Sequence, residues 1–512
     1  MLGLIRRHPL AAILTIAILL RILAVIYAQG YMAHDDHFET VRIAWEWRHE
    51  GMFFEDGSLR WEGKPGTGVL RSVVYNLFLL AQMKVTAALG IEYLDIHMYF
   101  DRAVHALLSL LPILFGFYYL RRETDSGTAL TGGLLLAAYG MMPFFAVKNL
   151  VEMVSADFLL PALCLAQFSM KNRSNALAIL AAVLGGIAFM IRFQAGLALI
   201  AVPIAMVIQS RRWKQAIIFS LGIVVMAALQ GLIDIWSHGQ FLGSISNYTA
   251  EYRNYLAGNP GPTPTIPGPW YRYILLILGI MVPPFSLVFV GSIFGREVIR
   301  KHLILLLAFI IFVAVHSIIA NKQERFIIPV FPVLLVLGSI GLYYLYRNGG
   351  WYFRWKGLRA ALWGWFALIN TALLILFTFN YAHRGAIEPM IYLNRQEKVE
   401  GVLFDTSERK KWLPYSYWNY RKPESVKLTP QYSLQEAINA GEVKPENPPK
   451  YIVVFSDGRP DRYIEKYDTY LGDYEIVFHG KPSLMDFILN RLNPKYNHLN
   501  ESWVLEFRTT QD

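Results

Sequence analysis

Two adjacent carboxylates, Asp35 and Asp36, occur in the segment AHDDHFE, which spans residues 33–39. A carboxylate held in position can act as a general base, taking the proton of a hydroxyl group while its oxygen attacks an electrophile. The segment begins a few residues after a long apolar run that ends at Gln29. If that run crosses a membrane, the carboxylates lie at the membrane surface, where a substrate carried by a lipid can meet them.

Two histidines, His34 and His37, flank the carboxylates at a spacing that could hold a divalent ion. We favour a hydrogen-bonding role for both, because that is the commoner use of histidines beside aspartates in a short loop. The single cysteine, Cys164, lies in an apolar stretch, so the chain has no thiolate cluster for a metal and no intrachain disulfide. The expectation is a site without a metal or another cofactor.

Cationic side chains that could accompany the carboxylates stand at the ends of apolar segments. Arg192 lies between two such segments, and Lys322 and Arg325 precede a third. An arginine at the end of a span is often only an interfacial anchor. Fixed positive charges can also stabilise a departing phosphate. With a base at the same interface, these residues suit transfer of a sugar from a lipid phosphate to an acceptor hydroxyl.

The composition identifies an integral membrane protein: of 512 residues 54% are hydrophobic and 17% are charged, and the mean hydropathy is +0.34. The run 10–29 is long enough, at about 1.5 Å per residue, to cross a hydrocarbon core of about 30 Å. It lacks a small-residue cleavage site, so we interpret it as an anchor. The net charge of +10 does not indicate nucleic-acid binding, because the basic residues are dispersed in short clusters.

Those basic clusters predict the topology, because Lys and Arg in short loops stay on the cytoplasmic side. Arg6 and Arg7 place the amino terminus in the cytoplasm, and later clusters near 121, 171, 211, 300 and 354 separate apolar segments. The carboxyl terminus is then outside. We predict about eleven transmembrane helices, at residues 10–29, 103–120, 127–146, 153–170, 175–191, 194–210, 215–236, 272–294, 302–320, 326–346 and 360–380.

Three loops are expected on the outer side. The first, 30–102, contains an apolar stretch at 69–89, which we expect to lie on the outer leaflet because a crossing would invert every later loop. The second, 237–271, carries five prolines between 260 and 269 and is expected to be irregular. The third is the short segment 321–325.

The chain becomes polar and mixed after about residue 381. Short β-like runs at 402–404, 451–455, 474–478 and 503–507 are accompanied by a helical pattern at 483–492. We therefore expect two domains: a transmembrane catalytic domain at 1–380 and a soluble extracytoplasmic α/β or α+β domain at 381–512. The second domain carries no glycine-rich nucleotide loop and no Gly-x-Ser-x-Gly elbow.

Four segments occur in the order of known motifs: DDHFE at 35–39, WEW at 45–47, GVLRS at 68–72 and NKQERFIIP at 321–329. Together they resemble the motifs of GT-C fold mannosyltransferases of glycosyltransferase family 22. That family includes the dolichyl-phosphate-mannose-dependent enzymes of N-glycan and GPI-anchor assembly. The resemblance covers the first 100 residues and the late loop with its following span, and does not extend to the C-terminal domain.

The resemblance implies that Asp35 is the general base and that Asp36 orients the acceptor or supports the base. Arg71, Lys322 and Arg325 would face phosphate or acceptor groups. Departures at Ala33 and His34, where the family commonly has His-Pro, and at Asn321, where it has His, bear on which sugar and acceptor are used. Taking Arg192 from its position between two apolar segments together with residues of these motifs, the candidate substrate-binding set is His37, Glu39, Trp45, Glu46, Arg71, Arg192, Lys322, Glu324 and Arg325.

The aromatic pair Trp45 and Trp47 has two open interpretations. Either ring could stack on a sugar, and either could anchor the loop in the lipid headgroup zone. The sequence favours neither interpretation over the other.

The expected function is inverting transfer of a hexose, by resemblance mannose, from a polyprenyl- or dolichyl-phosphate carrier to a lipid-linked glycan or other acceptor outside. Membrane lipids are expected partners. Short loops and the lack of an evident retrieval signal favour a bacterial inner membrane with a periplasmic site. A transporter or flippase of lipid-linked sugars would instead place ionisable residues in the middle of spans, often in repeated halves. A noncatalytic assembly subunit, with an outer domain that recruits partners, is the third alternative.

Overall fold

The computed structural model describes residues 7–61, 71–256, 266–349, 354–397, 399, 401–408, 411–418, 425–458 and 460–508. The chain divides into two compact units. The first unit comprises Met1–Ile22, Phe53–Phe78 and Arg102–Ile375, and the second comprises Leu23–Met52, Leu79–Asp101 and Leu376–Asp512. A two-domain boundary at residue 380 stays a prediction.

Apolar helices occupy every segment where a span was expected. Among the described residues, six are long and apolar enough to cross a membrane: α2 (Pro9–Tyr27), α6 with α7 (Leu94–Glu123), α10 (Val151–Asn172), α13 (Trp213–His238), η2 with α19 (Glu324–Arg347) and α21 (Lys356–Thr378). A seventh candidate is a helix pair bent by 114°, Arg272–Ile280 (α15) with Phe285–Lys301 (α16 and α17). Four shorter apolar helices are α8 (Ser126–Ala138), α11 (Asn175–Ile191), α12 (Ala195–Ser210) and α18 (Leu303–Ile318). The polytopic helical fold is thereby confirmed, and the number of crossings stays a prediction.

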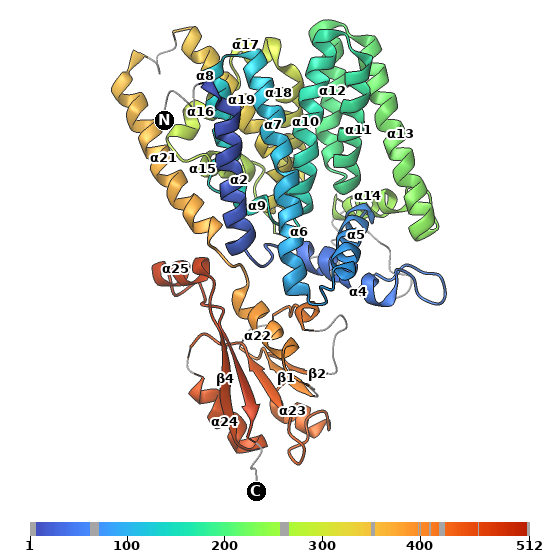
Figure 1. The fold of residues 1–512 in the computed structure, drawn as a ribbon, viewed down its shortest axis with the longest axis vertical. Helices are drawn as coiled ribbons and strands as arrows, with labels where there is room; N and C mark the ends of the chain where they lie inside the picture. Colours follow the sequence, from blue (N-terminus) through green and yellow to red (C-terminus); the bar gives the residue numbers. More distant parts are fainter. Residues whose placement is uncertain are drawn as a thin grey trace. The chain divides into compact units, whose positions relative to one another are not determined.

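Helix α10 is one of two deeply buried spans of the first unit: 89% of its apolar window is buried inside the protein, and 94% of that of η2 with α19, against 11% for α21. It packs on α7 and α11, while α11 also packs on α13 and α12 packs on α18 (Figure 1). Small residues allow these close approaches: a Cβ added to Gly186 of α11 would lie 2.3 Å from Met226 of α13. The large apolar side chains left on α21 and α13 are expected to face lipid.

Two of the loops that are expected on the outer side contain helices. Residues 243–256 form helix α14 (Gly243–Leu256), so the expectation of an irregular second loop is wrong for this part. The helix forms because it lies before the proline cluster and contains no proline, and because the N–H and hydroxyl of Ser244 both donate to Asp234 of α13. Pro260, Pro262 and Pro264 lie outside the described residues. In the first loop, α5 spans Val74–Ala88; its placement on the outer leaflet stays a prediction.

The second unit contains the expected α/β fold, a five-stranded mixed sheet of order β2-β1-β3-β5-β4. Its strands are β1 (Val402–Asp405), β2 (Ser425–Leu428), β3 (Tyr451–Val454), β4 (Tyr474–Gly480) and β5 (Ser502–Phe507). Strand β1 is parallel to both β2 and β3, and β5 is antiparallel to β3 and β4. Every residue of β1 and β3 is buried, as expected of strands covered on both faces.

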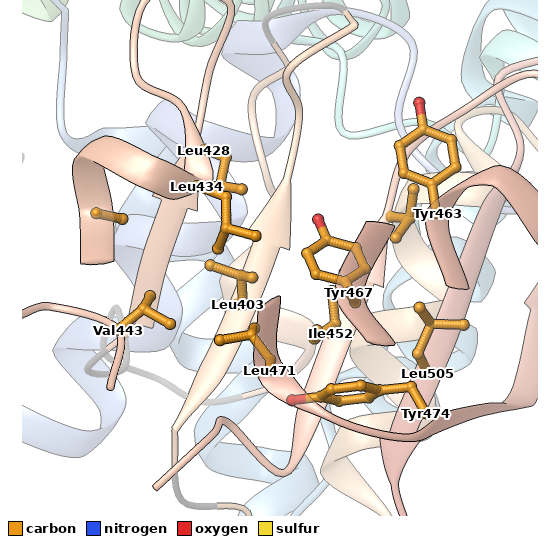
Figure 2. Packing of buried hydrophobic residues seen from close by; sticks show 12 residues of the cluster. Leu403, Leu428, Leu434, Val443, Ile452, Tyr463, Tyr467, Leu471, Tyr474 and Leu505 are labelled. Carbon is orange, nitrogen blue, oxygen red and sulfur yellow. The ribbon is translucent and has the colours of Figure 1, made fainter. Parts of the chain in front are cut away.

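Helices cover the two faces of this sheet. In Figure 2 Leu434 of α23 (Leu434–Asn439) and Tyr467 of α24 (Asp461–Leu471) join Leu403 of β1 and Ile452 of β3 in one buried cluster. The opposite face is covered by α22 (Arg384–Asn394), which packs on β4 and β5. Helix α25 (Leu484–Leu492) links β4 to β5.

The start of the first outer loop belongs to the second unit and lies against the segment that precedes α22. The backbone N–H of Ala382 donates to the carbonyl of Gln29 over 3.1 Å. Gly30 has a φ of +71°, and a Cβ there would lie 1.9 Å from the Ala382 carbonyl oxygen. Only glycine fits this position without moving the backbone. The contact holds the base of the loop that carries residues 33–39, the acidic segment.

Candidate active site

The acidic segment and the residues that follow it form three short helices: α3 (His34–Asp36), the π-helix η1 (His37–Val41) and α4 (Arg42–Glu50). Asp36 is buried, and its carboxylate accepts hydrogen bonds from the backbone N–H groups of Met32 and Ala33, each over 2.9 Å. A carboxylate in this position satisfies donors that the start of a helix leaves unpaired. Asp36 therefore fixes the turn beside Asp35, whose side chain lies outside the described part of the structure.

His37 is buried in a stack of aromatic rings. Its ring lies between Tyr31 and Tyr417, with centroid distances of 4.9 and 5.2 Å, and Tyr31 stacks in turn on His383 at 4.3 Å. Its Nε2 is 2.9 Å from the hydroxyl of Ser416. Burial, and secondarily the charge of Arg42, lowers the pKa of His37 to about 3, so the ring is neutral. These contacts attach the acidic segment to the loop that follows β1.

His34, on the other side of the carboxylates, contacts a tryptophan that the sequence analysis did not select. Its ring stacks on Phe38 at 4.5 Å and meets the ring of Trp412 edge to face at 4.7 Å. Trp412 is 65% exposed. Nothing in the local sequence marks this residue, because its partner His34 is far away along the chain.

The aromatic pair expected either to stack on a sugar or to anchor in headgroups lies inside the protein. Trp45 is 4% exposed and Trp47 is 2% exposed. The guanidinium of Arg48 lies over the Trp45 ring at 4.7 Å. Glu46, which lies between the two tryptophans in the sequence, forms an ion pair of 2.8 Å with Arg42. Glu39 is half-buried.

The cationic candidates Arg192 and Arg325 belong to the first unit and meet there on one carboxylate. Glu152, in the first turn of α10, is fully buried; its Oε1 lies 3.1 Å from Arg192 Nη2 and 3.6 Å from Arg325 Nε. Neither carboxylate oxygen of Glu152 accepts a hydrogen bond in the described part of the chain, and Arg192 Nε donates none there. Two buried guanidinium groups therefore meet on one carboxylate through ion pairs.

Lys322 binds the end of a helix. Its ammonium donates to the carbonyls of His316 and Ser317, over 3.2 and 2.8 Å, and to that of Ile319. These are unpaired carbonyls at the C-terminus of α18. Burial lowers the pKa of Lys322, and the positive charge of Arg272 lowers it further.

The remaining candidates lie near the surface of the first unit. Glu324 forms an ion pair with Arg272. Arg71 is half-buried and precedes Ser72, whose hydroxyl donates to Gln230 over 2.8 Å; residues 68–70 of that motif lie outside the described part. No group of three or more His, Cys, Asp or Glu side chains gathers as a metal site would require among the residues that the structure describes.

Comparison with known proteins agrees with this helical architecture. The model of the Alg9-like mannosyltransferase family matches residues 12–405. The chain belongs to the Alg9-like mannosyltransferase family. Membership in this family of glycosyltransferases confirms the resemblance that its motifs indicated.

The chain is similar to GPI mannosyltransferase 3 of Saccharomyces cerevisiae, with 26% identity over 144 residues, which are 27% of this chain. The match spans 23% of the yeast protein, less than a quarter of its length. The fold is that of solved GT-C enzymes. ArnT of Cupriavidus metallidurans, bound to undecaprenyl phosphate, is 14% identical with a TM-score of 0.59, covering 98% of each chain. The apo oligosaccharyltransferase of Archaeoglobus fulgidus is 14% identical with a TM-score of 0.51, covering 91% of this chain and 73% of that one.

Proposed function

We propose that this Alg9-like protein is an inverting glycosyltransferase that moves a hexose, mannose by its family, from a polyprenyl- or dolichyl-phosphate carrier to an acceptor hydroxyl. The acceptor is a lipid-linked glycan or another molecule on the non-cytoplasmic face. The observation that carries the proposal is the buried cluster in which Arg192 and Arg325 share Glu152. Arg192 Nε makes no hydrogen bond within the described part of the chain, so it can donate to an anionic ligand such as a phosphate.

In the proposed reaction Asp35 takes the proton of the acceptor hydroxyl while its oxygen attacks the anomeric carbon of the donor. The bond between that carbon and the phosphate oxygen breaks, and the phosphate leaves with the electron pair on its lipid. Attack opposite the leaving group inverts the configuration. Asp36 holds the turn that carries Asp35 through its two backbone hydrogen bonds.

Arg192 and Arg325 are the proposed phosphate ligands. Guanidinium groups suit this role because their planar donors match phosphate oxygens in pairs, and they remain charged. Glu152 orients both groups before the donor arrives, so little reorganisation accompanies the reaction. In this scheme Lys322 maintains the local backbone at the end of α18, next to Arg325, and fixed cations take the place of a metal.

Two further observations support the proposed donor lipid and the proposed side of the membrane on which the site lies. The similar fold of ArnT was solved with undecaprenyl phosphate, which supports a polyprenyl phosphate carrier. Basic residues near 121, 171 and 211 favour placing the loop 30–102 outside the cytoplasm. In a bacterial inner membrane this exterior is the periplasm, and the C-terminal domain is proposed to lie on the same side.

One observation favours the alternative function, transport of a lipid-linked sugar. Arg21 of α2 and Asp157 of α10 are both buried within helices long enough to span the membrane, and ionisable groups there often mark transport pathways. Arg21 however donates to Ser109 over 2.6 Å and to the Ala137 carbonyl over 3.2 Å, as a structural cation does.

Incubation of the purified protein with radiolabelled polyprenyl-phosphate mannose and a lipid extract of its native cells tests the proposal. The expected product is a labelled glycolipid whose new linkage has the anomeric configuration opposite to that of the donor. A transporter reconstituted in liposomes would move the labelled donor between leaflets and form no new linkage. Retention of configuration in the product would also contradict the proposal.

A further inference from the structure

An exposed tryptophan lies beside the acidic segment. Trp412, in the loop between β1 and the short helix η3 (Tyr415–Tyr417), is 65% exposed. Leu413, in the same loop, and Tyr417, in η3, are buried. Leaving so large an apolar ring in contact with solvent forgoes the free energy of burying it. The loop therefore presents Trp412 outward while its other apolar side chains anchor it.

The position of the Trp412 ring is defined by contacts with the acidic segment. It meets His34 edge to face at a centroid distance of 4.7 Å, and Phe38 at 6.1 Å. A second attachment is the contact of 2.9 Å between the Ser416 hydroxyl and His37 Nε2. The ring is thus held beside the residue that directly precedes Asp35 in the chain.

Trp45 and Trp47, the rings first considered for sugar stacking, are buried and cannot receive a ligand. Trp412 has the chemistry for that task, because the electron-rich face of an indole attracts the polarised C–H groups on the apolar face of a sugar ring. A saccharide whose hydroxyl is deprotonated at the acidic segment would bring its ring close to this indole.

Trp412 lies outside the part of the chain that the family shares. The family model ends at residue 405. Donor activation is common to the family and is expected within the shared region, whereas acceptor recognition distinguishes its members. We propose that Trp412 is the stacking platform for the acceptor saccharide, and this inference rests on the proposed glycosyl transfer.

The test compares Trp412→Ala, Trp412→Phe and the control Trp213→Ala in detergent, with labelled polyprenyl-phosphate mannose as donor and native-cell lipid extract as acceptor. Trp213 is a matched control because it is 62% exposed and lies at the start of α13. In Trp412→Ala the extract concentration for half-maximal transfer is expected to rise about tenfold. Trp412→Phe is expected to retain most of the affinity. The half-saturating donor concentration should match the wild type in all three variants. The rate at which water hydrolyses the donor and releases mannose, measured without extract, should also match.

An unchanged dependence on extract in Trp412→Ala would overturn the inference and leave the proposed function standing. If Trp412→Ala weakens the affinities for donor and acceptor together, Trp412 is needed for folding and the inference is likewise overturned. A defect seen in liposomes but absent in detergent would identify Trp412 as a membrane anchor, as exposed interfacial tryptophans often are. If the wild type gives neither transfer nor release of mannose, the proposed function itself fails.

Discussion

At the residue scale, the candidate site depends on how a few buried charges are neutralised. Arg192 and Arg325 meet on the carboxylate of Glu152 in the described structure. Removing one partner of a buried ion pair leaves the other desolvated and uncompensated, which costs more than the pair itself contributes. Both the folding of α10 and the binding of the donor are therefore expected to depend on this one side chain.

Glu152→Gln keeps the shape of the side chain and removes its charge. We expect the free energy of unfolding to fall by about 3 kcal/mol, and the half-saturating donor concentration to change while that of the acceptor stays constant. Thermal unfolding and donor titration measure the two effects. The matched control is Glu297→Gln, which removes a partly exposed pair with Lys301 and should alter neither by much. If Glu152→Gln has the stability and the donor binding of the wild type, Glu152 does not orient Arg192 and Arg325 for the donor.

The buried ring of His37 predicts a pH dependence. Its pKa is lowered from 6.5 to about 3 by burial and by Arg42, His34 and His383, so below pH 6.5 the unfolded chain binds a proton that the folded protein excludes. The contribution of the neutral His37 ring to the free energy of unfolding is complete above pH 6.5. It is lost progressively as the pH falls toward 3, and about 2 kcal/mol is lost at pH 5. Unfolding measured between pH 7 and 5 should show this loss in the wild type and a smaller slope in His37→Phe. Equal slopes would contradict the buried neutral ring.

At the scale of elements, the acidic segment is positioned by backbone contacts within the second unit. Gly30 is the clearest case, because its positive φ coincides with the approach of the Ala382 carbonyl. The aromatic stack of Tyr31, His37 and Tyr417 then attaches the segment to the loop after β1. Changes far from the carboxylates are thus expected to affect them through these attachments.

Gly30→Ala is expected to destabilise the protein by more than about 3 kcal/mol, since it combines strain at positive φ with a severe backbone clash. Gly57→Ala is the control, because Gly57 also has a positive φ, +79°, but nothing lies within 4 Å of its added Cβ. That variant should lose only about 1 kcal/mol. Chemical unfolding of both variants provides the comparison, and equal losses would show that the Ala382 contact is unimportant.

The sequence predicted features that are local or repeated along the chain. Apolar runs marked the helices, short β-like runs marked β1, β3, β4 and β5 but not β2, and DDHFE at 35–39 marked the candidate base. Contacts between distant segments were missed: Glu152 is hidden at the start of an apolar helix, and Trp412 acquires its role through His34. Helix α14 was missed because nearby prolines dominated the interpretation of its loop.

At the scale of the whole molecule, the account requires the acidic segment and the C-terminal domain to face the non-cytoplasmic side. Single cysteines introduced at exposed Glu55 and exposed Gln435, in a background with Cys164→Ala, report this orientation. A charged thiol reagent that does not cross membranes should label both in intact cells. A cysteine in the basic loop near Arg173 should react only after the membrane is broken. The opposite pattern would contradict the proposed topology.

The most direct measurement of the central claim compares sugar transfer by wild type, Asp35→Asn and Asp36→Asn at matched amounts of folded protein. The account predicts that Asp35→Asn lowers the rate constant of transfer by at least about a thousandfold with donor affinity and unfolding temperature preserved. Asp36→Asn should lower the unfolding temperature, because an amide replaces one of the two oxygens that accept backbone hydrogen bonds. Transfer at the wild-type rate by folded Asp35→Asn would contradict the claim that this carboxylate is the base.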